Sequence, residues 1–599
     1  MTWSAEHSRA RVWAPHADRV ELQWSTAAQL TPLEPKEQGW FEADLEDVAP
    51  GDRYVVRLDG GAGLPDPASL SQPDGVHGPS QVVDLSLNWT DDEWRNPPLH
   101  EHVIYELHVG TFTPAGTFDG VIDRLAHLVD LGVTAVELMP VAQFPGTRNW
   151  GYDGVDLYAV QNSYGGPHGL ARLVDACHGA GLAVILDVVY NHLGPEGNYL
   201  RQFGPYFTDR YQTPWGEAVN LDGPGSDHVR SFLLENALLW TEQFHVDGLR
   251  LDAVHAMFDR SARPFLRELA DSVHSRTESQ DRQVYLIAES SSNDPTLVEA
   301  RAVGGQDLAA AWNDDFHHAL HVTLTGETAR YYADFADPVE DLATGISDGY
   351  IISGRYSAYR GRRHGASSRH LPRSSLVVFA QNHDQIGNRA QGERLSILVD
   401  PARQRFAAAV TLLSPWVPML FQGEEWGETR PFAYFIDHGD DALSLAVRQG
   451  RSQEFAGFIA PGEEVPDPAA PSTFENSKLD WDSIAHQEHR PTLELHKALI
   501  SVRHRHHALA DPDPASHTAS RTGSVITVES SAGNQRVVTV CNAAAQRGTG
   551  RLPPGRWRRL IDTSDRQFGG GGSRTPASCD GGEFDLDPWG CVAYEETHP

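Results

Sequence analysis

The sequence predicts an α/β protein: a central (β/α)8 TIM barrel, preceded by an immunoglobulin-like β-sandwich and followed by a second β-sandwich domain. Across the middle of the chain, strand-like runs alternate with helix-length amphipathic stretches. On both flanks, short alternating runs are separated by Pro, Gly and Asp, which is typical of antiparallel sheets. Three carboxylates also follow three apolar runs, and a parallel barrel collects its active site at such strand ends.

Eight strand-like runs are predicted for the barrel. They are VIYELHV from Val103, AVELMP from Ala135, AVILDVV from Ala183, DGLRLDA from Asp247, VYLIAES from Val284, a weaker run at Leu308–Trp312, LVVFAQN from Leu376 and VPMLFQGEE from Val417. Stretches with helical periodicity, such as 118–131 and 168–181, separate these runs. Eight strands with intervening helices make a closed barrel the most economical arrangement.

Three domains are expected: 1–95, 96–504 and 505–599. The first contains the runs ARVWAPHA, RVELQWS, GWFEADL and RYVVRLDG, and it ends before Pro97 and Pro98. The third contains SVITVES, QRVVTVCN, RWRRLID and GCVAYEE, with a glycine run at 569–572 between two of them. Both flanking domains are therefore predicted to be all-β.

The charge balance argues against two classes of partner. Lys and Arg total 48 against 82 Asp and Glu, a net charge of -34, which repels nucleic acid and anionic lipid. The 15 tryptophans suit a protein that stacks on sugar faces. No charged start followed by an apolar stretch opens the chain, and no apolar run is long enough to span a membrane, so we expect a cytoplasmic protein.

The four cysteines, Cys177, Cys541, Cys579 and Cys591, form no CxxC pair. Neither a zinc ribbon nor a redox dithiol is indicated. We expect ordinary buried thiols, with pairing of Cys579 and Cys591 as the alternative.

Asp252 is the predicted nucleophile. Residues two apart in a strand face the same side, so Arg250 and Asp252 point together into the barrel mouth while Leu249 and Leu251 pack outward. A guanidinium beside a carboxylate keeps it ionised, as attack on an anomeric carbon requires. The alternative is a structural Arg–Asp pair at a strand end.

Two further acids complete the predicted catalytic set. Glu289 ends the apolar run VYLIAE, where burial should raise its pKa and allow it to act as general acid and base. Asp384, beside His383 in QNHDQ, can bind sugar hydroxyls and stabilise positive charge at the anomeric centre. Taken singly, Glu289 could be the first solvated residue after a strand, and Asp384 part of a polar turn.

Together these segments resemble the four motifs of the α-amylase superfamily of retaining glycoside hydrolases and transglycosylases. DVVYNH (187–192), DGLRLDAVH, the Glu289 strand and QNHD occur in the expected order, and NWGYDGVDLYA is similar to the aromatic loop of that superfamily. The resemblance implies that Asn191 helps to organise the site. It also implies substrate-binding roles for Arg250, His192, His383, Tyr152 and Asp153. Without this context, each histidine could equally belong to a polar turn and Tyr152 to the core.

A narrower resemblance is to the malto-oligosyltrehalose trehalohydrolase family. It rests on segments such as DPASLSQPDGVHGPS, WNDDFHHALHVTLTGE, YRGRRHG, QNHDQIGNRAQGERL and FQGEEWGETRPFAYFIDH. Glycogen branching enzymes usually follow the aspartate of the fourth motif with Glu-Val, whereas this chain has Gln385-Ile386. DAVH also departs from the Lys-His pair that many plain amylases carry after the nucleophile.

This resemblance implies hydrolysis of the α-1,4 bond next to the terminal trehalose unit of malto-oligosyltrehalose, with retention at the anomeric carbon. Trp215, Tyr359 and Arg360 are the candidates for the trehalose-binding side, although a packed loop aromatic and a solvated arginine-rich loop would explain them equally well. A malto-oligosyltrehalose synthase would supply the substrate. No cofactor is implied, and no acid cluster suggests a metal.

Two other functions stay open from the sequence. The first is glycogen branching or debranching, or general α-glucanase activity. The second is a non-catalytic glucan-binding protein, although such a descendant would usually have lost one of the three acids.

Overall fold

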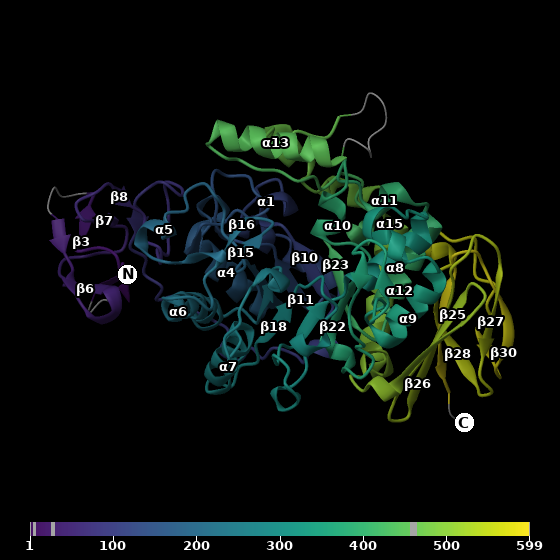
Figure 1. Cartoon of the computed structure of the whole chain (residues 1–599). Coiled ribbons are helices and arrows are strands. Elements are labelled where there is room, and N and C mark those ends of the chain that lie inside the picture. Colours follow the sequence, from purple (N-terminus) through teal and green to yellow (C-terminus); the bar gives the residue numbers. More distant parts are fainter. Residues whose placement is uncertain (1, 4–7, 26–29, 456–463, 598–599) are drawn as a thin grey trace.

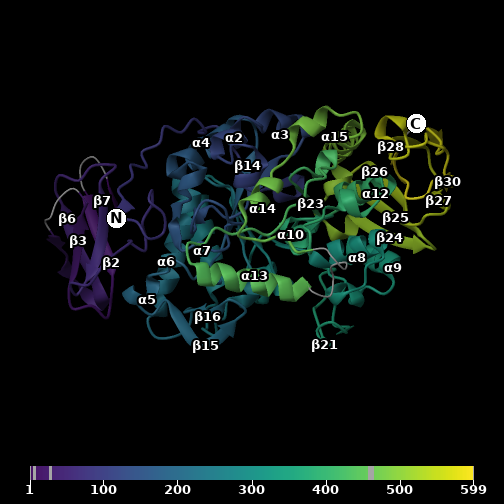
Figure 2. The ribbon, with the colours of Figure 1, turned by 90° about the horizontal axis from the view of Figure 1, so that it is seen from above.

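The computed structural model describes residues 2–3, 8–25, 30–455 and 464–597. The barrel occupies the middle of the molecule, between the N-terminal strands at one end and the C-terminal sheet at the other (Figure 1). A view turned by 90° keeps the two β regions on opposite sides of the barrel (Figure 2). The domain boundaries near residues 95 and 505 stay predictions.

Eight parallel strands close the barrel, in chain order around the ring. They are β10 (Ile104–Leu107), β11 (Ala135–Leu138), β14 (Ala183–Val188), β17 (Gly248–Leu251), β18 (Tyr285–Ala288), β19 (Ala310–Trp312), β22 (Leu376–Phe379) and β23 (Val417–Phe421). Each lies within a run predicted from the sequence, including the weak sixth one. The runs are almost wholly apolar because a barrel strand is buried on both faces. The predicted fold class is confirmed.

Helices surround the barrel. The main ones are α4 (Gly166–Gly179), α6 (Ser226–Leu238), α7 (Phe265–Glu278), α8 (Asp314–Thr325), α9 (Pro338–Asp348), α12 (Pro401–Leu412) and α15 (Arg490–Arg505). The stretch expected as one helix at 118–131 forms two, α2 (Phe118–Ile122) and α3 (Leu125–Leu131), which are separated by Asp123 and Arg124. Shorter helices are α1 (Val109–Phe112), α5 (Leu200–Phe203), α10 (His383–Gly387), α11 (Leu395–Leu398) and α14 (Pro471–Asn476), and α13 (Asp441–Phe455) lies outside the barrel (Figure 1).

Alternation along the strands divides the core into two layers. Ile104, Ile185 and Ile287 pack with Trp312 inside the barrel. Leu249 and Leu251, on the opposite face of β17, pack into the layer between strands and helices. Arg250 lies between those two leucines in sequence and therefore faces the barrel interior.

The N-terminal strands form two small sheets. One contains β1 (Thr2–Trp3), β2 (Ser8–Trp13), β6 (Trp40–Leu45) and β5 (Glu34–Pro35), and the other contains β4 (Leu30–Pro32), β3 (Val20–Trp24), β7 (Arg53–Leu58), β8 (Gly63–Leu64) and β9 (Ser80–Gln81). Trp13 contacts the barrel region, with ring centroids 5.3 Å from Tyr206 and 4.8 Å from His228.

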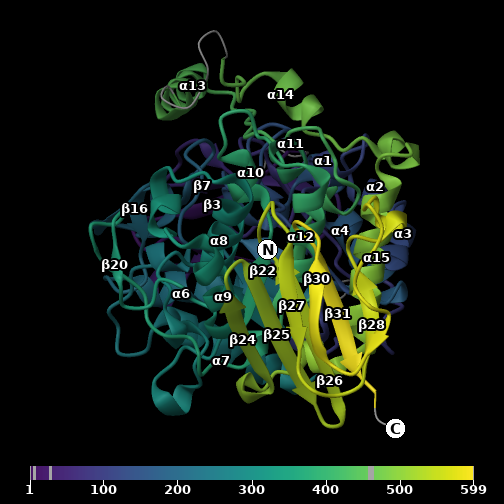
Figure 3. The ribbon, with the colours of Figure 1, turned by 90° about the vertical axis from the view of Figure 1, so that its right-hand side faces the viewer.

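The C-terminal sheet has six strands in the order β24-β25-β26-β31-β28-β29 (Figure 3). Their bounds are β24 (His517–Thr522), β25 (Val525–Ala532), β26 (Gln535–Asn542), β28 (Trp557–Asp562), β29 (Ser578–Cys579) and β31 (Cys591–Glu596), and β27 (Gly548–Leu552) pairs with β30 (Gly582–Leu586) as a separate ribbon. Phe406 of α12 meets Trp589 at 5.5 Å between ring centroids, which joins this sheet to the barrel helices.

All four cysteines are free thiols. The alternative pairing of Cys579 with Cys591 is wrong, because β28 lies between the strands that carry them. Two strand spacings amount to about 9–10 Å, which is too far for a disulfide.

Within the described part of the chain, no helix is both long and apolar enough to cross a membrane.

Asp247 fastens the segment before the barrel to its base. This buried carboxylate accepts hydrogen bonds from His178 Nε2 at 2.8 Å, from the Val184 amide at 2.9 Å and from Trp94 Nε1 at 2.9 Å. His178 donates its other ring N–H to Asp91 at 2.8 Å. Burial lowers the pKa of His178, but its hydrogen bonds with the two aspartates and their charges outweigh burial and raise that pKa.

We predict that Asp247→Ala destabilises the protein by about 3 kcal/mol, because it leaves Nε2 of the buried His178 and Nε1 of the partly buried Trp94 without their acceptor. The midpoint of thermal or urea unfolding measures the loss. Asp92→Ala, a truncation of an exposed acid in the same segment, should change stability by less than about 0.5 kcal/mol.

The same variant should show a particular pH dependence. A histidine with a raised pKa stabilises the fold fully below its ordinary pKa of 6.5, and this contribution is lost as pH rises through the folded value. The difference in the free energy of unfolding between wild type and Asp247→Ala should therefore become smaller from pH 6 towards alkaline pH. A difference in the free energy of unfolding that does not change with pH would contradict stabilisation by a protonated His178.

Candidate active site

Arg250 holds three carboxyl groups around one buried guanidinium. Its Nη1 lies 2.7 Å from Asp187 and 2.9 Å from Asp252, and its Nη2 lies 3.6 Å from Glu289. The guanidinium carbon stacks 4.2 Å from the ring centroid of Trp312, and the side chain is 0% exposed. A charge removed from water in this way is stable only because anions surround it.

Asp252 follows β17 and is held from two directions. Arg250 contacts its Oδ1, while Asn191 Nδ2 donates to its Oδ2 at 2.6 Å and to its carbonyl oxygen at 2.7 Å. His192 fixes Asn191 in turn, through a 2.6 Å contact between its Nδ1 and Asn191 Oδ1. The carboxylate is thereby locked in one orientation at the barrel mouth, which suits a nucleophile.

Glu289 follows β18 and lies next to Asp252. Its Oε2 accepts the backbone amide of Ala253, the residue after Asp252, at 2.5 Å. Burial raises the pKa of Glu289 to about 8, opposed by the charge of Arg250 and supported by those of Asp252 and Asp384. A carboxyl with this pKa keeps its proton at neutral pH and can donate it to a leaving oxygen.

A chain of hydrogen bonds links Glu106, His383, Tyr152 and Asp187. Glu106 accepts from His383 Nδ1 at 2.5 Å, and His383 Nε2 lies 2.8 Å from the Tyr152 hydroxyl, which donates to Asp187 at 2.6 Å. Burial lowers the pKa of His383, but the charges of Glu106 and Asp384 outweigh burial and raise it to about 9. A protonated His383 donates at both nitrogens, which agrees with this chain.

Asp384 lies at the open side of the site. It is the second residue of α10, whose N-terminus is capped by the Asn382 side chain, and its carboxylate is 3.7 Å from His383 Nε2. The side chain is 42% exposed, far more than Asp252 or Glu289. Asp384 is therefore the one of the three predicted catalytic acids that is open to solvent.

Two of the three candidates for the trehalose-binding side contact a residue or loop of this centre. Trp215 lies in the turn between β15 (Phe207–Thr213) and β16 (Gly216–Val219), 49% exposed, and stacks on His192 at 4.5 Å and 8°. Tyr359 is 54% exposed. Arg360 donates to the carbonyl oxygen of Ser291, in the loop after Glu289, at 3.1 Å. Trp215 and Arg360 thus contact a residue or loop of the site, whereas the exposed ring of Tyr359 lies beside Tyr331, with 6.0 Å between ring centroids.

Asp153 lies less directly at the centre. It follows Tyr152, but its carboxylate accepts from Asn149 Nδ2 at 2.6 Å and lies 3.7 Å from His438 Nε2. These contacts fit a role in shaping the aromatic loop.

Sequence reasoning missed two members of the buried network, Glu106 and Asp187. Both are acids inside otherwise apolar strands, at positions where the side chain faces the barrel interior. An inward acid in a buried strand is costly unless paired, so it signals a partner. The sequence does not reveal that the partners are His383 and Arg250.

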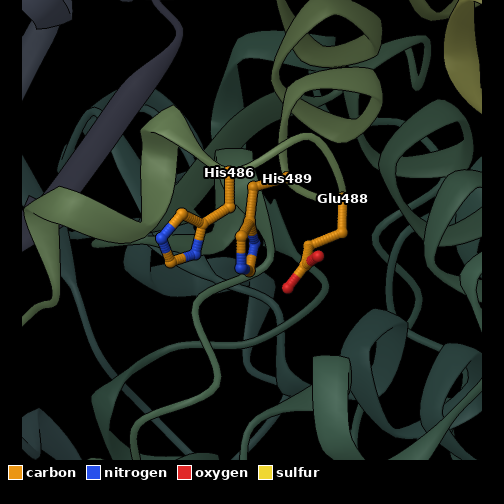
Figure 4. Close-up of side chains that lie close together, drawn as sticks. All are labelled: His486, Glu488 and His489. Atoms are coloured by element: carbon orange, nitrogen blue, oxygen red, sulfur yellow. The ribbon is translucent and has the colours of Figure 1, made fainter.

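Among the described residues, His486, Glu488 and His489 form the single group with metal-ligand spacing (Figure 4), their candidate ligand atoms all within 4.8 Å of one another. His489 Nδ1 donates to the Trp426 carbonyl at 2.7 Å. The group lies at the start of α15, beside Arg490, where the positive end of a helix disfavours a cation. We assign it no part in the chemistry.

Two family models match the N-terminal third of the chain. The alpha amylase catalytic domain matches residues 71–213, and carbohydrate-binding module 48, the isoamylase N-terminal domain, matches residues 1–73.

Curated relatives match much more of the chain. The malto-oligosyltrehalose trehalohydrolase of Saccharolobus solfataricus is 48% identical over 82% of this chain and 84% of its own length. This chain belongs to the malto-oligosyltrehalose trehalohydrolase family. Another member, from Deinococcus radiodurans, is 42% identical over 89% of this chain and 87% of its own length.

Solved structures share the fold of this chain. A Salmonella typhimurium protein, provisionally named an alpha amylase, is 38% identical with a TM-score of 0.90 and covers 100% of this trehalohydrolase-family chain and 99% of its own. A pullulanase from Anoxybacillus with bound maltotetraose has a TM-score of 0.70 at 20% identity, covering 100% of this chain and 87% of its own, and shows the fold alone.

The pKa of Glu289 gives a testable pH profile. The acid form required for leaving-group protonation persists up to about pH 8 and is lost above it. We therefore predict that kcat/KM stays level through neutral pH and falls about tenfold for each pH unit well above 8. Initial rates on the trehalohydrolase substrate from pH 5 to pH 10 measure this. A fall that begins near the ordinary glutamate pKa of 4.5 would rule out a raised pKa for the catalytic acid.

Proposed function

We propose that this chain hydrolyses the α-1,4-glucosidic bond next to the terminal trehalose unit of malto-oligosyltrehalose, releasing trehalose and a malto-oligosaccharide. The observation that carries the proposal is the 48% identity to a named trehalohydrolase over 82% of the chain. The arrangement of Asp252 and Glu289 around Arg250 supports the same reaction class.

In the first step, Asp252 attacks the anomeric carbon of the glucose on the non-trehalose side. Glu289 donates its proton to the glycosidic oxygen, and trehalose leaves as the C–O bond breaks. The product is a covalent glycosyl-enzyme. Both carboxyls contact the guanidinium of Arg250, and Glu289 also accepts the amide beside Asp252, so they lie close together, as a retaining mechanism requires.

In the second step, the ionised Glu289 removes a proton from water, and the resulting hydroxide attacks the anomeric carbon. Asp252 is released as a carboxylate and Glu289 regains its proton, so the enzyme returns to its starting state. Two inversions give net retention at the anomeric carbon. No cofactor enters either step.

We assign binding of the reacting glucose to His383, Tyr152 and Asp384. His383 and Tyr152 rings stack with centroids 5.3 Å apart and are hydrogen-bonded to each other, so the ring face and the cationic imidazole are presented together. Asp384, exposed beside them, accepts hydrogen bonds from sugar hydroxyls and stabilises positive charge in the transition state.

Selection of trehalose is assigned to the opposite side of the scissile bond. Trp215 offers a large exposed indole supported from behind by His192, which suits stacking on a sugar face. We assign the other wall to Tyr359 and to Arg360, whose side chain donates to the Ser291 carbonyl oxygen. The substrate itself must come from an enzyme that converts the reducing end of a maltodextrin into an α,α-1,1-linked unit.

Product analysis tests the proposed reaction. The pure protein is incubated separately with maltopentaose and with maltotriosyltrehalose, and the products are separated by chromatography. We expect free trehalose and maltotriose from the second substrate and little cleavage of the first. Equal cleavage of both would indicate a general α-glucanase, and transfer products in place of maltotriose would indicate branching activity.

The nucleophile assignment predicts that Asp252→Ala lowers kcat at least about 10³-fold, because no other group can form the covalent intermediate. Far-ultraviolet circular dichroism should be unchanged, because Asp252 lies beyond the last strand residue. Asp585→Ala, the same change at an exposed acid of β30, should keep full activity. Turnover within tenfold of wild type in Asp252→Ala would refute the assignment.

A further inference from the structure

Two cysteines face each other across the centre of the C-terminal sheet. β26 and β31 are adjacent antiparallel strands, and their register places Cys541 directly opposite Cys591. In Figure 3, β31 lies within this sheet, on the side of the molecule that faces the viewer. Directly opposed residues on neighbouring strands project to the same face, so the two side chains are neighbours.

The hydrogen bonds identify the kind of strand pair. Asn542 donates its amide to the Gly590 carbonyl at 2.9 Å, so the position next to the cysteines is a hydrogen-bonded pair. Cys591 directs both its amide and its carbonyl to the other neighbouring strand, where Thr563 Oγ1 and the Thr563 amide each lie at 2.9 Å. Cys541 and Cys591 are therefore a non-hydrogen-bonded pair.

The type of strand pair determines how far apart the two cysteines lie. In a non-hydrogen-bonded antiparallel pair the Cα atoms are about 4.5 Å apart and the side chains approach most closely. Disulfides need Cα atoms about 4.4–6.8 Å apart. The pair thus falls inside the range that a disulfide can bridge without moving the strands.

Burial and contacts agree with this placement. Cys541 is 4% and Cys591 1% exposed, and both belong to the cluster that joins the sheet to the barrel helices. Burial and a hydrogen bond with the thiol of Cys541 raise the pKa of Cys591. Cys579 packs instead with the cluster on the other face of the sheet, beside Trp557 and Tyr594.

We propose that Cys541 and Cys591 form a cross-strand disulfide when the chain meets a small-molecule disulfide. One protein thiolate attacks the small disulfide, forms a mixed disulfide and expels one small thiolate. The second protein thiolate then attacks the mixed disulfide and expels the other. Two protein thiols are oxidised, one small disulfide is reduced to two thiols, and the two protons pass to the leaving thiolates.

The burial of both thiols determines how fast the disulfide forms. A buried thiol with a raised pKa reacts slowly, because the thiolate is the nucleophile and the reagent must reach it. β31 lies between β26 and β28, so access requires the sheet to open or the reaction to occur before the sheet has packed. Once formed, the bond closes residues 542–590 into a loop and should stabilise the C-terminal sheet.

The test uses the full-length protein, reduced and then incubated with oxidised glutathione in urea below the unfolding midpoint. Free thiols are alkylated, and a non-reduced digest is mapped by mass spectrometry. We expect a single linked peptide pair that contains Cys541 and Cys591, the loss of two of the four free thiols, and a thermal midpoint a few degrees higher that dithiothreitol reverses.

Matched variants separate the pair from the other thiols. Cys541→Ser and Cys591→Ser should each abolish both the link and the rise in midpoint, whereas Cys579→Ser and Cys177→Ser should keep them. The proposal is overturned by four free thiols after incubation, or by a link that involves Cys579 or Cys177. The wild-type peptide map stays decisive even for a serine variant that fails to fold.

Discussion

A guanidinium with no contact to water has to be surrounded by anions, and Arg250 meets this requirement with Asp187, Asp252 and Glu289. This requirement has one consequence for Asp252 and another for Glu289. Arg250 orients Asp252, the proposed nucleophile, and it keeps the second carboxyl close enough to act on the same bond. The remaining groups of the site supply hydrogen bonds to this charge cluster. Asn191 donates to Asp252, and the Glu106–His383 pair connects to Asp187 through Tyr152.

The different surroundings of Asp252 and Glu289 suit the two carboxyls to different roles. Asp252 receives Arg250 on one oxygen and Asn191 on the other, so its negative charge is satisfied on both sides. Glu289 lies farther from Arg250 and close to the charges of Asp252 and Asp384, and with burial these raise its pKa to about 8. Two carboxyls at neighbouring strand ends can therefore serve as nucleophile and acid at one pH.

Much of the fold was predictable from local patterns. Apolar runs located all eight barrel strands, and the period of two in GLRLDA placed Arg250 and Asp252 on the inner face. Pairings between distant segments were not predictable in this way. Three pairs depend on which segments become neighbours in space: Glu106 with His383, Asp247 with His178, and Cys541 with Cys591. That arrangement is set by the packing of the whole chain and not by a local sequence pattern.

The clamp at Asp247 has a consequence for the modular appearance of the chain. Asp247 immediately precedes β17, and Asp252 immediately follows it, so one short strand joins the docking point of the leading segment to the proposed nucleophile. Through Trp94 and Asp91, the connection from the N-terminal sandwich is bound to the base of that strand. The N-terminal sandwich and its connecting segment therefore cannot be exchanged as an independent domain. An exchange that alters residues 91–96 would remove contacts that hold β17, the strand that leads to Asp252.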